Sequence, residues 1–372
     1  MLERRAVTVF ALATLLFAAV LPGKAFAQSR FSKFGFWTFD LQGGMVIPND
    51  PGDSPVLGNT AVYTVNIGIG GRMVGPQYWK NYLKNPYFGL KIGFDRIDNS
   101  VVGNRASLAA YIEQPFARTR HWDFGFMFAF GLSYLEKTYD SVGNPQNMFI
   151  GSHLNALINL GLTANWHVTD KLTMYSSINF THSSNGTIQL PNKGVNIAQL
   201  ELGAKVNFHP YSPQDMQPPA TLVATSGLER KNSVFINFSP VYNSSRKSWE
   251  HYFSTSMSVG YRRKFHPCFA YGAGVDLMYD ASLEQAHEPN LPENNYAVSG
   301  YGLLEAYWGR FSLRGAVGYY AWRGCDFALP FYERIGVYYN ITKHQYIGAS
   351  IKAHAAHAQF LEWTYGVALV DW

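Results

Sequence analysis

Residues 172–184 read LTMYSSINFTHSS, and apolar and polar side chains alternate through most of this stretch. Side chains alternate between the two faces of a β-strand, so one parity of the stretch forms an apolar face. That face contains Leu172, Met174, Ser176, Ile178, Phe180, His182 and Ser184. His182 and Ser184 therefore end an otherwise apolar face, where packing alone hardly explains them. Their residue types are those of a base and a nucleophile presented to lipid.

Similar alternation recurs along the whole chain after the first 30 residues or so. The segments that carry it are Gly35–Pro48, Thr60–Val74, Tyr87–Ile97, Arg105–Phe116, Trp122–Leu135, Phe149–His167, Leu172–His182, Val195–His209, Ser233–Tyr242, Tyr252–Arg263, Phe269–Tyr279, Tyr296–Trp308, Phe311–Trp322, Phe331–Asn340, Gln345–His354 and Phe360–Trp372. We therefore predict an all-β fold, an antiparallel transmembrane β-barrel of about sixteen strands. Two smaller barrels in tandem are the alternative, and we favour one barrel because a single closed wall leaves no extra edges.

The N-terminus predicts export. Arg4 and Arg5 precede the apolar run at 6–21, and Ala25-Phe26-Ala27 has the small-x-small form of a signal-peptidase site. We expect a signal peptide at residues 1–27, cleaved near Ala27, and a bacterial outer-membrane location. The remaining chain divides into a first barrel half at 28–210, a proline-containing linker or long turn at 211–232, and C-terminal barrel strands at 233–372.

The composition excludes several function classes. The net charge is only +5 and charged residues make up 15% of the chain, with no basic run interleaved with aromatic residues. We therefore expect no nucleic-acid partner. The two cysteines and eleven histidines have no spacing typical of a zinc site, so neither a metal nor a cofactor is predicted.

The connections alternate in length, as they do in outer-membrane barrels, where periplasmic turns are short and outer loops are long. Short turns occupy 168–171, 264–267 and 341–344, and longer loops occupy 49–59, 137–148, 183–194 and 281–295. With a periplasmic N-terminus, the strand Leu172–His182 runs outward. His182 is then expected at the outer leaflet.

Residues i and i+2 of a strand lie ~6.6–6.8 Å apart and point the same way. Histidine could take the hydroxyl proton of Ser184 during attack on an acyl carbonyl, and return it to the leaving alcohol. Asn185 and the backbone around Gly186 are candidate donors to the oxyanion, because glycine lets the chain approach a substrate closely. On its own, His-x-Ser is a weak motif, and a polar cap at the membrane interface is the alternative reading.

A longer stretch resembles the active-site region of the lipid A 3-O-deacylases (PagL type). It runs from His182-Ser183-Ser184-Asn185-Gly186 to Leu190-Pro191-Asn192-Lys193-Gly194-Val195-Asn196. Members of that family carry a His-x-Ser-Asn motif, a loop with Pro-Asn-x-Gly and then the last barrel strand. The resemblance implies a Ser-His-Glu triad on the lipid-facing outside of a barrel, with removal of the ester-linked 3-hydroxyacyl chain at position 3 of lipid A. It makes His182 the base, Ser184 the nucleophile and Asn185 part of the oxyanion hole.

Two features depart from this family pattern. The position of the family's acid, two residues after the loop glycine, is Asn196, which shares its parity with Ala198, Leu200 and Leu202. An asparagine can orient the imidazole but supplies no negative charge. Glu362 is a weaker alternative acid, if the barrel brings its strand beside Leu172–His182. The second departure is the C-terminal half, which lies beyond the length of one family domain.

The sequence therefore predicts an outer-membrane esterase that acts on lipid A of lipopolysaccharide by Ser/His nucleophilic catalysis. Lipopolysaccharide in the outer leaflet and the outer-membrane assembly machinery are the expected partners. The alternative function is a pore or transporter for small solutes, in which the His-Ser motif is not catalytic. A lumen wide enough for water would favour the pore, and a plugged or narrow lumen would count against it.

Overall fold

The structure is a computed structural model that describes residues 33–75, 80, 82–211, 232–244, 250–282, 295–324, 329–355 and 357–371. The expected signal peptide lies outside these residues, as does nearly all of the expected linker. Within the described part of the chain, no helix is long and apolar enough to cross a bilayer.

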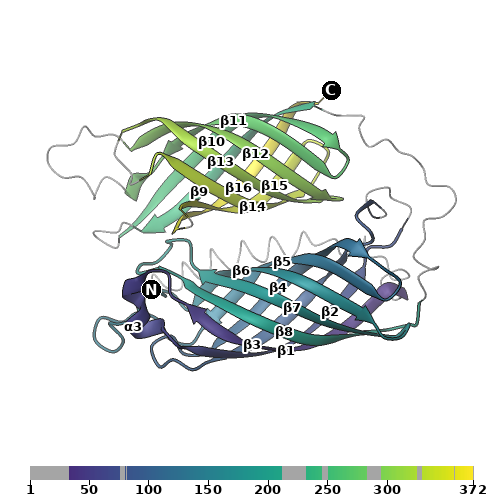
Figure 1. The fold of residues 1–372 in the computed structure, drawn as a ribbon. Helices are drawn as coiled ribbons and strands as arrows, with labels where there is room; N and C mark the ends of the chain where they lie inside the picture. The colour runs from purple at the N-terminus through teal and green to yellow at the C-terminus, as the bar shows by residue number, and fades with distance from the viewer. Residues whose placement is uncertain are drawn as a thin grey trace. The chain divides into compact units, whose positions relative to one another are not determined.

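Sixteen strands account for most of the described chain (Figure 1). The first eight are β1 (Gly35–Ile47), β2 (Ala61–Arg72), β3 (Tyr87–Ile97), β4 (Arg105–Arg118), β5 (Trp122–Leu135), β6 (Leu154–His167), β7 (Leu172–Ser184) and β8 (Val195–Asn207). The second eight are β9 (Asn232–Ser244), β10 (His251–His266), β11 (Phe269–Tyr279), β12 (Tyr296–Trp308), β13 (Phe311–Arg323), β14 (Phe331–Asn340), β15 (Gln345–His354) and β16 (His357–Asp371). The predicted strands are thereby confirmed, and the clearest shift of a boundary is at the start of β6.

These strands form two closed antiparallel barrels of eight strands, one after the other along the chain. In the first, β8 returns to β1 with a register that runs from Ile47 opposite Asn196 to Phe36 opposite Asn207. In the second, β16 returns to β9. The preference for a single sixteen-stranded barrel was therefore wrong, and the tandem alternative is correct. Once β8 has paired with β1 along nearly its whole length, no free edge remains for β9 to extend.

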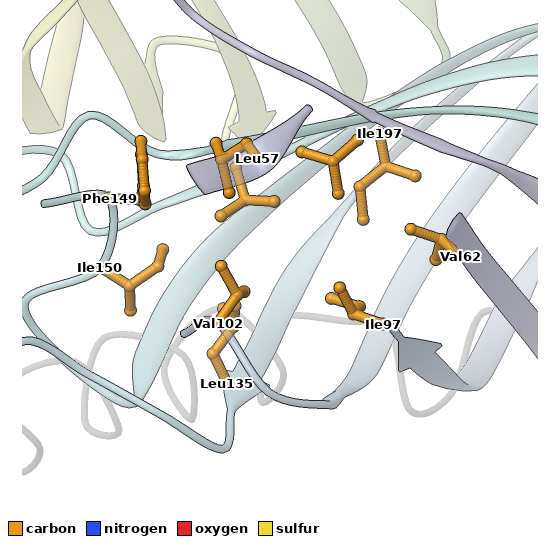
Figure 2. Packing of buried hydrophobic residues seen from close by; sticks show 10 residues of the cluster. Leu57, Val62, Ile97, Val102, Leu135, Phe149, Ile150 and Ile197 are labelled. Atoms are coloured by element: carbon orange, nitrogen blue, oxygen red, sulfur yellow. The ribbon is translucent and has the colours of Figure 1, made fainter. Parts of the chain in front are cut away.

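The loop end of the first barrel contains an apolar cluster (Figure 2). Loop residues Leu57, Val102, Phe149 and Ile150 pack there against side chains from the strand ends, which are Val46, Val62, Ile97, Leu135, Val195 and Ile197. Leu57 belongs to a short helix, α3 (Ser54–Leu57), which follows a single 3-10 turn, η1 (Pro51–Asp53). The cluster also explains why β6 begins at Leu154 and not at Phe149, because Phe149 and Ile150 are buried under the loops.

Apolar side chains face outward and polar side chains face inward, as the alternation predicts. On β7, Met174, Ile178 and Phe180 are 41–63% exposed on the outside, whereas Tyr175 and Asn179 are buried inside. On β8 the outward Leu200 and Leu202 are 65% and 69% exposed. Such an outward apolar surface on a closed barrel suits a lipid environment.

Ion pairs fill the interior of each barrel. In the first, the Nζ of Lys91 lies 2.9 Å from Asp40 Oδ2 and 2.6 Å from Glu201 Oε1, and Lys205 Nζ lies 2.6 Å from Glu113 Oε2. In the second, further buried pairs involve Arg262, Arg314, Arg334, Glu305, Asp276 and Glu362. Eight strands leave a lumen just wide enough for side chains to fill, and here paired charges occupy part of it.

Candidate active site

The register of β7 against β8 brings two predicted site residues together. His182 lies directly opposite Asn196, and both side chains point to the outside of the first barrel. Directly opposed residues have Cβ atoms ~4.5–5.5 Å apart on the same face, which is within reach of an imidazole and a carboxamide. The register between β7 and β8 therefore places Asn196 beside His182. Because side-chain direction repeats every two residues, Ser184 lies on the same face as His182.

His182 is hydrogen-bonded through both ring nitrogens. Nδ1–H donates to Asn196 Oδ1 at 2.6 Å, and the Ser184 hydroxyl donates to Nε2 at 2.9 Å. An amide oxygen only accepts, so this geometry places the proton on Nδ1 and leaves the lone pair of Nε2 for the serine proton. The predicted Ser184, His182 and Asn196 thus form one continuous chain of hydrogen bonds, with the spacing that an activated nucleophile requires.

Asn49 extends this chain, and the sequence reasoning missed it. Asn196 Nδ2 donates to Asn49 Oδ1 at 2.5 Å, and Asn49 Nδ2 donates to the carbonyl oxygen of Gly194 at 3.0 Å. Asn49 follows β1, more than a hundred residues before Asn196. Only the closure of β8 on β1 brings the two together, so no local sequence signal could have found the contact.

Gly194 lies against the ring of His182. Its φ is +79°, in the left-handed region, and a Cβ added there would lie 2.5 Å from His182 Cε1 and 3.1 Å from Nε2. Its N–H donates to the carbonyl of Phe149 at 2.9 Å. Both the backbone conformation and the close approach require glycine, which explains the glycine of the expected loop motif.

The segment Asn185–Lys193 belongs to the second compact unit of the chain. The backbone N–H of Asn185 donates to Asn192 Oδ1 at 3.1 Å, and Asn185 Nδ2 donates to Gln189 O at 2.8 Å. Gly186 has a φ of +62°. The side chain of Asn185 therefore holds the loop together, and its role toward an oxyanion stays a prediction.

Asn192 is a second loop residue that the sequence reasoning did not single out. Its Nδ2 is buried and has no hydrogen-bond partner in the described part of the chain. Its Oδ1 receives the N–H of Asn185, the first peptide group after Ser184. Burial without a partner is costly for a donor, so the open amide of Asn192 is suited to a group that binds there.

The strand that carries Glu362 is not a neighbour of β7 in the sheet. That strand, β16, pairs with β15 and β9, so the condition on which the role of Glu362 as an alternative acid depended is not met. The carboxylate is buried inside the second barrel, where it accepts from Arg334 at 3.1 Å and from Ser350 Oγ at 3.0 Å. Closure into separate barrels removes the juxtaposition that the acid role needed.

The described residues include no cluster of three or more His, Cys, Asp or Glu side chains that could hold a metal ion. Asn196, His182 and Ser184 are residue types that proton transfer and nucleophilic attack can use. Its outward position on the barrel wall directs that chemistry to molecules outside the lumen.

Two family models match the chain. Residues 63–205 match the family of lipid A 3-O-deacylase (PagL), and residues 225–371 match the C-terminal domain of acyloxyacyl hydrolase. The first match contains the strands and the loop of the candidate site. No curated protein sequence matches the chain.

Three solved structures illustrate what the chain is similar to. The outer membrane enzyme PagL is 16% identical, with 45% of this chain and 97% of that one covered and a TM-score of 0.33. Neisserial surface protein A is 12% identical, with 46% and 96% covered and a TM-score of 0.31. A triple mutant of the Rhodopseudomonas blastica porin is 12% identical, with 91% and 99% covered and a TM-score of 0.17.

Proposed function

Because the chain belongs to the lipid A 3-O-deacylase (PagL) family and carries an extra C-terminal barrel, we propose that it removes an ester-linked 3-hydroxyacyl chain from lipid A in the outer leaflet. The observation that carries the proposal is the hydrogen-bonded chain of Ser184, His182 and Asn196 on the outer face of the first barrel. The exposed apolar side chains on the same face give the acyl chains of the substrate a surface on which to lie.

In the proposed mechanism, Ser184 Oγ attacks the carbonyl carbon of the ester while His182 Nε2 takes the hydroxyl proton. When the tetrahedral intermediate collapses, the imidazolium returns that proton to the departing sugar oxygen, and the acyl group stays on Ser184. Water, activated in the same way by Nε2, then releases the fatty acid. Asn196 orients Nδ1–H throughout, but without a negative charge it stabilises the imidazolium less than a carboxylate does.

The oxyanion of the intermediate needs nearby donors, and each is worth about 3–4 kcal/mol. We assign this role to Asn185 and to the backbone around Gly186, the residues that the resemblance and the position directly after Ser184 single out. The hydrogen bond from Asn185 N to Asn192 Oδ1 fixes the conformation of this loop.

We expect alanine at position 194 to lower deacylation about a hundredfold while the barrel still forms. The new Cβ overlaps the imidazole and the backbone is strained at a φ of +79°, so His182 must move, and a misplacement of ~1 Å can slow a reaction about 10²-fold. The measurement is the rate of fatty-acid release from lipopolysaccharide. Gly143→Ala is the matched control, because its Cβ meets no atom closer than 3.4 Å. Equal rates for the two variants would contradict the placement of Gly194 against the ring.

The alternative function, a pore for small solutes, gains no support from the interiors of the barrels. A cavity inside the first barrel measures about 50 Å³, room for a few water molecules, and its lining mixes apolar side chains with polar and charged ones such as Lys91, Asp95 and Arg105. An apolar cluster of buried side chains also lies at the loop end of the same barrel. These features favour chemistry at the outer wall over passage through the lumen.

The proposal is tested with the purified full chain in vesicles that contain lipopolysaccharide. Mass spectrometry of the lipid A is expected to show the loss of one 3-hydroxyacyl chain, and the same protein in planar bilayers is expected to conduct no ions. Unchanged lipid A combined with steady conductance would contradict the proposed esterase function and favour the pore. The proposal also includes insertion by the outer-membrane assembly machinery and cleavage of the signal peptide near Ala27. N-terminal sequencing of the membrane-inserted protein checks the cleavage site.

A further inference from the structure

We propose that Asn49 is a positioning residue that holds the amide of Asn196 in the one orientation that makes His182 a base. The inference rests on the proposed function, and it concerns how an amide can stand where the family has an acid. All the residues involved (Asn49, His182, Ser184, Gly194 and Asn196) belong to the first unit of the chain.

An amide at position 196 introduces a choice that a carboxylate does not have. Both oxygens of a carboxylate accept, so either orientation receives Nδ1–H of His182. A carboxamide has one accepting and one donating end. If its NH₂ group faced His182, Nδ1 would have to accept, the ring proton would move to Nε2, and Nε2 could no longer take the proton of Ser184. The wrong tautomer alone can slow a serine hydrolase about 10⁴-fold.

A backbone carbonyl settles this choice through Asn49. The oxygen of Gly194 can only accept, so the end of Asn49 that faces it, at 3.0 Å, must be the NH₂ group. The oxygen of Asn49 then faces Asn196 and receives its Nδ2–H at 2.5 Å. Asn196 therefore presents Oδ1 to His182 Nδ1 at 2.6 Å. Each donor and acceptor in this chain thus has a single consistent assignment. As a result Nδ1 carries the ring proton, and Nε2 is left to accept the hydrogen bond from Ser184.

The fold fixes both Gly194 and Asn49, the two residues at the start of this hydrogen-bond chain. The N–H of Gly194 donates to Phe149 O at 2.9 Å, which fixes the peptide whose neighbouring carbonyl receives Asn49. Asn49 lies just past Ile47, the residue of β1 that pairs with Asn196 across the closing seam of the barrel. Pro48 restricts the backbone between them. Asn49 is thus supplied by the first strand of the barrel to the site on its last two strands.

A double-mutant comparison tests the proposal. Asn49→Leu, which keeps the approximate volume but neither donates nor accepts, is expected to lower deacylation about 10- to 100-fold when residue 196 is Asn, the size typical of losing a group that orients a ligating or catalytic side chain. In an Asn196→Glu background, the same change is expected to lower the rate only about twofold, because a carboxylate needs no orientation. Asn49→Asp, which keeps an acceptor for Asn196, is expected to lose less activity than Asn49→Leu.

Asn104→Leu is the matched control. Asn104 is a half-buried loop residue of the same barrel whose side chain makes no hydrogen bond in the described part of the chain, so its replacement is expected to leave the rate within about twofold. If Asn49→Leu keeps full activity, or lowers the rate equally with Asn and with Glu at position 196, the positioning role is wrong. The proposed esterase function is not affected by that result.

The tautomer of His182 gives a readout that does not require activity. In ¹⁵N-histidine-labelled protein at a pH where the imidazole is neutral, the resonances that disappear in His182→Gln are expected to show the proton on Nδ1. Asn49→Leu is expected to shift population to the Nε2–H form, and Asn49→Asp is expected not to. Absence of deacylase activity in the wild-type protein would contradict the proposed function. An unchanged tautomer in Asn49→Leu would contradict only the positioning role of Asn49.

Discussion

Alanine in place of Ser184 is expected to lower the deacylation of lipid A by more than about 10³-fold, with the barrels still assembled. Ser184 Oγ is the only group in the proposed mechanism that bonds to the acyl carbon, and loss of a nucleophile removes the covalent route, leaving only substrate binding and oxyanion stabilisation. The measurement is the rate of fatty-acid release, together with the mass of the lipid A. Whether the barrels have folded is checked by the shift in electrophoretic mobility between unheated and boiled samples.

The neighbouring serine provides a matched control. Ser183 points to the other face of β7, where it accepts from Arg105 NH1 at 2.9 Å inside the barrel. Ser183→Ala removes one internal hydrogen bond, worth about 1 kcal/mol, and is expected to keep most of the activity. Similar loss in both variants, or full activity in Ser184→Ala, would exclude Ser184 as the nucleophile.

The largest expected effect on stability is at Glu305 in the second barrel. This carboxylate is 3% exposed and pairs with Arg262 NH1 at 2.9 Å and with Arg314 NH2 at 3.3 Å. Glu305→Leu leaves two buried guanidinium groups without their acid. The free energy of unfolding is expected to fall by about 3–5 kcal/mol, the range for breaking a buried ion pair from one side. Urea unfolding in lipid vesicles, followed by tryptophan fluorescence, measures the change.

A compensated variant separates the unpaired charges from the loss of packing. Replacing Glu305 by Leu and both arginines by Met removes the charges together, and such replacements of whole buried ion networks are often neutral. The compensated chain is therefore expected to recover most of the lost stability. If Glu305→Leu unfolds at the wild-type urea concentration, the ion network does not contribute to the stability of the barrel.

Much of the fold was predictable because strand faces depend on local geometry. The period of two in side-chain direction sorted lipid-facing from lumen-facing residues, and the strands were found from it. The spacing of His182 and Ser184 is part of the same local pattern, since residues i and i+2 share a face. The parity of Asn196 likewise placed it correctly on the outside of β8.

The predictions that failed are those that depended on which strands are neighbours. The sixteen strands carry the same alternation, and the backbone groups that join them are chemically identical, so pattern alone cannot say where a wall closes. For this reason one barrel was preferred to two. The role offered to Glu362 failed for the same cause, because it required β16 to lie beside β7.

The sequence by itself thus determined the β-strands, their faces and the pair His182–Ser184, since each follows from backbone geometry over a few residues. Only the tertiary structure decided that β8 closes on β1, and with it that Asn49 meets Asn196. The physical reason is that several strand edges far apart in the sequence could pair. The pair that forms is the one whose register matches along the entire strands. The residue placed to orient the amide of Asn196 therefore comes from the opposite end of the first barrel's sequence.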